Sequence, residues 1–174
     1  MYPGDYIAYP SAGVDSYQVK GKPSLRMSKK RIHVIGLGYD NTRSSGILSI
    51  LDPEQFYACV AYNQYDKGMK ENVCEANSQI LSDASIYMTM DIGDFSFMFS
   101  KLCEIAYEYL SIGDVIFAPD GPKPLIMAMS MVVSHIQCPG VTCIQILENE
   151  NCFHPVDVSH VGKVIGFSIS YTKD

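Results

Sequence analysis

Two short segments of the sequence, 38–45 and 120–124, combine glycine with polar and charged side chains in the manner of anion-binding loops. The first supplies Gly38, the hydroxyls of Thr42 and Ser44, and the guanidinium of Arg43, just where a helix is expected to begin. A helix N-terminus presents free N–H groups and a partial positive charge, which favour an anion there. An arginine beside it can hold a phosphate through two hydrogen bonds. The composition of this loop therefore indicates a site for a phosphorylated ligand.

A second interpretation of the first segment needs no ligand. Asp40, Asn41 or Thr42 could simply cap the helix, because short polar side chains accept hydrogen bonds from the first free N–H groups. The glycines at 36, 38 and 46 do not have the spacing of the dinucleotide fingerprint GxGxxG. The sequence alone leaves both interpretations of this loop open.

The second segment reads Asp120-Gly121-Pro122-Lys123-Pro124. Its glycine allows a backbone to approach a ligand closely, and its lysine falls in the first turn of the next expected helix. Lysine is electrostatically unfavourable at a helix N-terminus, where carboxylates are preferred. We therefore predict that Asp120, Gly121 and Lys123 bind an anion, although a plain turn with a solvated lysine would have the same sequence.

Other polar residues suggest catalysis less strongly. His154, His160 and Asp157, with Cys152 nearby, have no spacing typical of a metal site, and we interpret this stretch as a surface loop. Asp94 is explained as a helix cap. Carboxylates and hydroxyls at Asp40, Ser44, Asp91 and Asp120 could line the cleft of an enzyme, but they include no compelling nucleophile–base pair. We expect no catalytic residues, no metal and no cofactor.

The elements that would position these loops alternate regularly between strand and helix. Buried strands are predicted at 32–38, 56–62, 86–90, 114–118 and 141–147, and helices at 42–51, 67–81, 94–110 and 122–135. The Met and aromatic stripe of the helix 94–110 has the spacing of a core-facing surface. Residues 164–171 could add an edge strand. Such alternation predicts a mostly parallel sheet of five or six strands with helices on both faces.

The site prediction depends on the order of these strands. In an open parallel sheet, ligands bind outside the carboxyl ends of the strands where the strand order reverses. The first and fourth strands commonly flank that point, and the two candidate loops follow these strands directly. We divide the chain into a partly irregular N-terminal extension, 1–31, with strand-like character near 6–9 and 16–19, and an α/β domain, 32–174.

Composition narrows the class of protein. Hydrophobic residues make up 47% of the 174 residues, and the formal net charge is −6, which argues against a broad nucleic-acid-binding surface. No stretch is long and apolar enough to span a membrane, and residues 1–25 lack the apolar core of a signal peptide. The six cysteines include no CxxC pair. We expect buried free thiols and a cytoplasmic location, with disulfides or a metal site as the alternatives.

The strand followed by Asp-Gly-Pro-Lys-Pro-Leu and an Ala/Met-rich helix resembles the Gly-Thr/Pro-Lys-Pro-Met element of CARF-type (CRISPR-associated Rossmann-fold) domains. It is also similar to related Rossmann-like domains of bacterial defence proteins. The resemblance covers roughly residues 32–147 and implies a Rossmann-like, doubly wound fold. It also implies a cleft for nucleotide ligands, often at a homodimer interface, with Gly121, Lys123, Thr42 and Ser44 in contact with the ligand. Pro122 stands where many sensors carry Thr, so a hydroxyl contact is lost.

Together these features predict a nucleotide- or phosphate-ligand sensor linked to bacterial defence, which signals through a homodimer or a larger protein partner. The cleft would be formed by Gly38, Thr42, Arg43, Ser44, Asp120, Gly121 and Lys123. An enzyme that processes nucleotides or nucleosides on the same scaffold is the main alternative, and a non-catalytic subunit of a larger complex is the third. One scaffold hosts many functions, so the fold does not separate them.

Overall fold

We describe the fold from a computed structural model of the chain. The structure describes residues 5–8, 17–20, 30–39, 41–66 and 68–148 and the single positions 166, 168 and 170. Of residues 5–8, 17–20 and 145–148, only the backbone is described.

A five-stranded, all-parallel sheet forms the centre of the protein, in the strand order β5-β4-β3-β6-β7. Its strands are β3 (Lys30–Leu37), β4 (Phe56–Tyr62), β5 (Ile86–Asp91), β6 (Gly113–Ala118) and β7 (Val141–Cys143). The first strand of this sheet, β3, pairs with both the second and the fourth, β4 and β6. The predicted α/β fold with a parallel sheet is confirmed, and the strand order reverses between β3 and β6.

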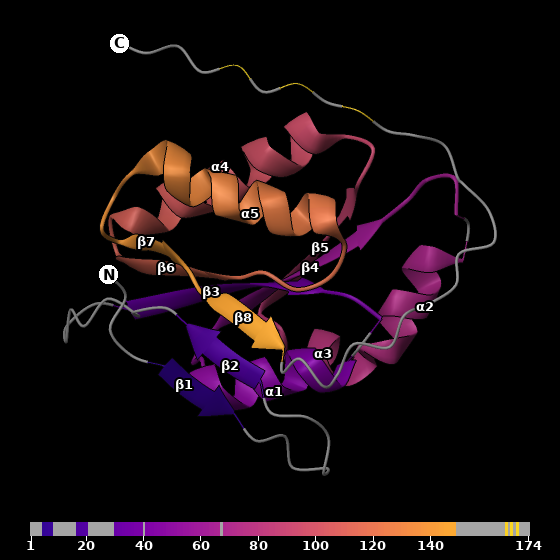
Figure 1. Cartoon of the computed structure of the whole chain (residues 1–174), viewed down its shortest axis with the longest axis horizontal. Helices are drawn as coiled ribbons and strands as arrows, with labels where there is room; N and C mark the ends of the chain where they lie inside the picture. Colours follow the sequence, from indigo (N-terminus) through magenta and orange to yellow (C-terminus); the bar gives the residue numbers. More distant parts are fainter. Residues whose placement is uncertain are drawn as a thin grey trace.

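Helices cover both faces of the sheet. They are α1 (Asn41–Leu51), α2 (Met69–Ala76), α3 (Ser78–Asp83), α4 (Phe95–Leu110) and α5 (Lys123–Ile136). The helices α4 and α5 lie on one side, and α1, α2 and α3 lie on the other (Figure 1). In the described part of the chain, no helix has the length and apolar character needed to cross a membrane.

The strand sequences explain why both faces are covered. Successive side chains of a strand point to opposite faces, and β3 is apolar at nearly every position. Ile32 and Val34 pack into the core beneath α4 and α5, whereas Ile35 and Leu37 pack into the core beneath α1, α2 and α3. The stripe predicted on the helix 94–110 is core packing, with Met98, Leu102 and Ile105 buried.

One continuous helix was predicted at 67–81, and this was wrong, because the structure has two helices there, α2 and α3. The chain bends at Asn77, with φ −109° and ψ 21°, between α2 and α3. Its side-chain Nδ2 donates to the carbonyl of Val73 and to that of Gly38, each at 2.8 Å. Asparagine side chains compete in this way with regular helical hydrogen bonding, which explains the interruption.

A second, smaller sheet joins the two ends of the described chain. It is antiparallel, in the order β1-β2-β8, with β1 at Asp5–Ala8, β2 at Tyr17–Lys20 and β8 at Gln145–Glu148. The strand predicted at 141–147 is therefore divided between two sheets at Ile144, which is buried. Strands β1 and β2 both contact α1. The edge strand predicted at 164–171 lies outside the described residues apart from three single positions.

Candidate functional site

The two candidate loops meet at the point where the strand order reverses. They follow β3 and β6, which are neighbours in the sheet with Ile35 opposite Ala118. A Cβ atom on Gly36 would lie 2.2 Å from the backbone oxygen of Asp120, so only glycine fits there. Gly121 has φ +91°, a conformation that glycine adopts without strain. In the first loop itself, a Cβ on Gly38 would lie 2.9 Å from the Cα of Gly121, so close backbone contact explains the glycines at this junction.

The carboxylate of Asp120 links the two loops. Its Oδ1 accepts a hydrogen bond from the backbone N–H of Gly121 at 2.8 Å, and its Oδ2 accepts one from Ser44 Oγ at 2.9 Å. Arg43 Nη1 lies 3.3 Å from Oδ1 and forms an ion pair with it. Asp120 is only 4% exposed, so these donors replace the water that its carboxylate would otherwise bind.

Asn77 holds the first loop from the other side. Its amide donates to the carbonyl of Gly38, and Asn77 itself is buried. Sequence reasoning missed this residue, although a signal was present. Asn77 lies four residues after Val73 and three before Ile80, so a polar amide occupies the apolar face of the predicted helix. A buried amide needs partners, and here the partner is the candidate loop.

A cavity of about 420 Å³ opens beside these contacts. This volume is within the range of pockets that hold small molecules, about 300–1,000 Å³. The cavity is lined by Gly38, Tyr39, Arg43, Met69, Val73, Asp120, Gly121 and Pro122. Its walls are mainly apolar, with one cation and one carboxylate that pair with each other. Partial burial and then the nearby Asp66 carboxylate raise the pKa of Tyr39, which keeps its phenol neutral.

The structure brings together most, but not all, of the predicted site residues. Gly38, Arg43, Asp120 and Gly121 line the cavity. Ser44 is completely buried and reaches the site only through its bond to Asp120. Thr42 is half-buried, and its hydroxyl lies 3.4 Å from Asn41 Oδ1.

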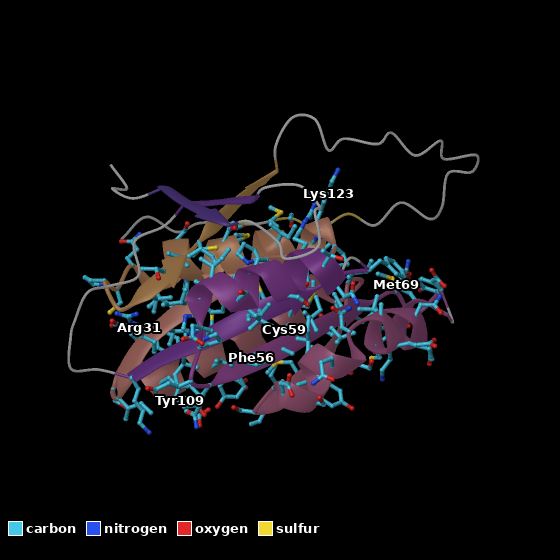
Figure 2. The ribbon with its side chains drawn as sticks, turned by 90° about the horizontal axis from the view of Figure 1, so that it is seen from below. Arg31, Phe56, Cys59, Met69, Tyr109 and Lys123 are labelled. Carbon is cyan, nitrogen blue, oxygen red and sulfur yellow. The ribbon has the colours of Figure 1, made fainter. Side chains whose placement is uncertain are left out.

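The predicted lysine lies outside this group. Lys123 is the first residue of α5 and is exposed, and its side chain projects away from the ribbon (Figure 2). It is not a lining residue, although its neighbour Pro122 is. Met69 and Val73, which sequence reasoning did not place at the site, enter from α2, a helix that packs against β4, the neighbour of β3.

The described residues do not assemble a catalytic centre at this cavity. Ser44 has no exposed surface from which to attack a substrate. Asp91 accepts a hydrogen bond from the N–H of Gly93, and Asp94 caps α4 by accepting one from Phe97, as predicted. No group of three or more His, Cys, Asp or Glu side chains in the described part of the chain could hold a metal ion. Cys152, His154, Asp157 and His160 lie outside that part, as does Asp40.

No family model matches the chain, and no curated protein matches it in sequence. Inferences about this site therefore depend on the positions of its residues alone. That geometry offers a mostly apolar pocket with a hydrogen-bonded carboxylate at one wall.

Proposed function

We propose that this protein binds a nucleotide or a related phosphorylated small molecule at the carboxyl ends of β3 and β6. One observation carries the proposal: a cavity of about 420 Å³ lies at the reversal point of a parallel sheet and is lined by both candidate loops. Ligands of open parallel sheets bind at this place because the loops of neighbouring strands separate there. The first turns of α1 and α5 begin at the same edge and favour negative charge nearby.

The role that we propose is recognition without turnover. The site is held rigid by hydrogen bonds between its own loops, and the hydroxyl closest to its carboxylate, that of Ser44, is buried. The resemblance of the Asp-Gly-Pro-Lys-Pro-Leu segment to CARF-type domains supports a sensor linked to bacterial defence. Ligand binding would then change the contacts of a homodimer or of a larger protein partner, by favouring one of two conformations.

We also propose that the protein works in the cytoplasm. The described cysteines Cys59, Cys74, Cys103, Cys138 and Cys143 are all free thiols. Burial raises the pKa of the Cys59 thiol to about 12, so this side chain acts as a small apolar group of the core. Unpaired thiols in this number are typical of a reducing compartment.

Native mass spectrometry of the purified protein is the first test, because it reports a carried ligand and the oligomeric state together. Isothermal titration with ribonucleotides then measures affinity for the wild type and for Tyr39→Ala. Loss of an aromatic surface that stacks on a base should weaken binding about tenfold. Tyr87→Ala is the matched control: Tyr87 is 55% exposed and Tyr39 56%, but Tyr87 lies on β5, away from the cavity.

The same experiments distinguish recognition from the two alternatives, an enzyme and a structural subunit. Formation of a product from a nucleotide, abolished by a change at Asp120, would show that the protein is an enzyme. Absence of both binding and turnover, with co-purification of a larger protein, would favour a structural subunit. Equal affinities for Tyr39→Ala and Tyr87→Ala would place the ligand elsewhere on the protein.

A further inference from the structure

The charges and shapes of the lining residues decide which part of a ligand fits into the cavity. The two charged lining residues, Arg43 and Asp120, form an ion pair with each other at 3.3 Å. Their charges therefore largely cancel within the cavity. A phosphate placed against this pair would gain little from the guanidinium and would be repelled by the carboxylate.

The carboxylate of Asp120 retains capacity for one more hydrogen bond. An ionised carboxylate has about four acceptor positions. Oδ1 accepts from Gly121 and interacts with Arg43, whereas Oδ2 accepts only from Ser44 among the residues that the structure describes. Because Asp120 lines the cavity, a donor carried by the ligand can bond to this carboxylate. The ligand group must carry a proton, as a hydroxyl or an amino group does, whereas a fully ionised phosphate has none to donate.

The other walls suit a flat, weakly polar group. Tyr39, Met69, Val73 and Pro122 provide an aromatic ring, a flexible thioether and two rigid apolar surfaces. Aromatic rings stack on nucleobases without regard to sequence, and thioethers pack favourably against aromatic edges. The neutral phenol of Tyr39 adds no charge to these walls.

We propose that the nucleoside part of the ligand occupies the cavity, and that a ribose hydroxyl or an amino group of the base donates a hydrogen bond to Asp120. The phosphate groups then lie outside the cavity, on the side of Pro122 where the exposed Lys123 begins α5. This inference rests on the proposed function and assigns Asp120, rather than Lys123, the larger part in recognition. It also predicts that a ligand without phosphate still binds.

The experiment measures binding of the four common ribonucleosides, their 5′-monophosphates and inorganic pyrophosphate to the wild type, to Asp120→Asn and to Asp114→Asn. Asp114 is the matched control, because it is equally buried on β6 but at the opposite end of that strand. We expect the wild type to bind a nucleoside. Asp120→Asn should lower the affinity for that nucleoside at least tenfold, and Asp114→Asn should leave it within twofold of the wild-type value.

Analogues identify the donor without any mutation. Loss of about tenfold affinity with the 2′-deoxy or 3′-deoxy compound assigns the donor to the ribose. The same loss on removing the exocyclic amine of the base, as from adenosine to purine riboside, assigns it to the base. Because these measurements use the wild type, they remain decisive if Asp120→Asn does not fold.

The possible negative results contradict different proposals. Binding of pyrophosphate and nucleotides without binding of any nucleoside would overturn this inference and leave the proposed function standing. Equal affinity of the wild type for every deoxy and deamino analogue would overturn it as well. Absence of binding by every compound would overturn both proposals.

Discussion

A buried aspartate lies near each end of the strand β6, and the two carboxylates differ in the hydrogen-bond donors around them. Asp114, 1% exposed, is the second residue of the strand, and Asp120, 4% exposed, lies two residues beyond its end. The carboxylate of Asp120 has donors from Gly121, Ser44 and Arg43. In the described part of the chain, neither carboxylate oxygen of Asp114 has a hydrogen-bond donor.

Helix direction explains this contrast. In a βα unit, helices begin at the carboxyl ends of the strands, so free N–H groups and capping side chains gather there. The same helices end near the amino ends of the strands, where carbonyl groups are left over instead. A carboxylate therefore finds donors at one end of β6 and few at the other. His33 Nδ1 and Thr142 Oγ1, both level with Ile116 in the middle of β6, also lack partners among the described residues. So does Asn77 Oδ1 at the donor-rich end, so the contrast concerns the two aspartates and not every buried acceptor.

The largest expected effect tests whether the two ends differ in packing. A Cβ on Gly36 would lie 2.2 Å from the oxygen of Asp120, and a Cβ on Gly113 would lie 2.2 Å from that of Lys30. Gly36→Ala and Gly113→Ala should each lower the free energy of unfolding by about 3 kcal/mol, because backbone must move at both sites. Urea denaturation measures this.

Gly166→Ala is the control, since a Cβ there meets nothing within 4 Å. If Gly36→Ala or Gly113→Ala costs no more than this control, the strands are not closely packed at that end. Similar costs at both ends would show that the ends differ in their polar groups and not in their packing.

The next effect is a pH dependence that arises from His33, between the two ends of the sheet. Burial, reinforced by the positive charge of Arg31, lowers the pKa of His33 from 6.5 to about 4. Between these pH values the unfolded chain binds a proton that the folded protein does not, so stability falls as the pH is lowered. The loss approaches about 3 kcal/mol below pH 4, at 1.36 kcal/mol for each pKa unit.

Denaturation of the wild type and of His33→Leu between pH 7 and pH 4 measures this contribution. The variant should lose less stability over that interval, because its side chain does not titrate. Parallel curves for the two proteins would contradict the assignment, and would mean that carboxylates alone set the acid sensitivity.

A direct comparison of the two aspartates should give a smaller effect. Asp120→Asn places an amide donor against either the Ser44 hydroxyl or the Gly121 N–H and removes the negative charge from the ion pair with Arg43. We expect a loss of about 2 kcal/mol of unfolding free energy, as for a disrupted, partly buried charged hydrogen-bond group. Asp114→Asn breaks no hydrogen bond of the described structure and should change stability by less than about 1 kcal/mol.

Thermal denaturation of both variants at neutral pH makes this comparison. An equal loss for the two substitutions would show that Asp114 has a partner as strong as those of Asp120. The contrast between the ends of β6 would then be withdrawn.

The sequence predicted this fold well because its signals are local. The apolar strand 56–62 is β4 to the residue, and the glycine-ended strand and acidic turn flank the reversal point as expected. The break at Asn77 was not predicted, because Val73, Ala76 and Ile80 continue a helical pattern through it. Its cause is a hydrogen bond to Gly38, 39 residues away in the sequence.

The two candidate loops lie side by side as expected, but the sequence did not indicate how their side chains would pair. Arg43 and Asp120 were each expected to meet a ligand, yet they meet each other across 77 residues of sequence. Propensity and spacing carry no information on which charged side chains will pair after folding. Met69 and Val73 were missed for a similar reason, because only the packing of α2 against the sheet at β4 brings them to the cavity.

The smallest effect expected concerns Lys123, which lies at the donor-rich end but outside its hydrogen-bond network. Lys123→Ala should leave stability unchanged, because the side chain is exposed and no ion pair of the described structure includes it. The substitution should weaken the binding of a nucleoside 5′-monophosphate about two- to fivefold, which is the size of a solvent-screened charge contact. The affinity for the parent nucleoside should not change. Titration calorimetry at low and at physiological salt measures both, and the difference between the two ligands should shrink as salt rises. A tenfold or larger loss that is equal for nucleoside and nucleotide would mean that the lysine turns inward to the base or ribose, and Asp120 would then share its part in recognition with Lys123.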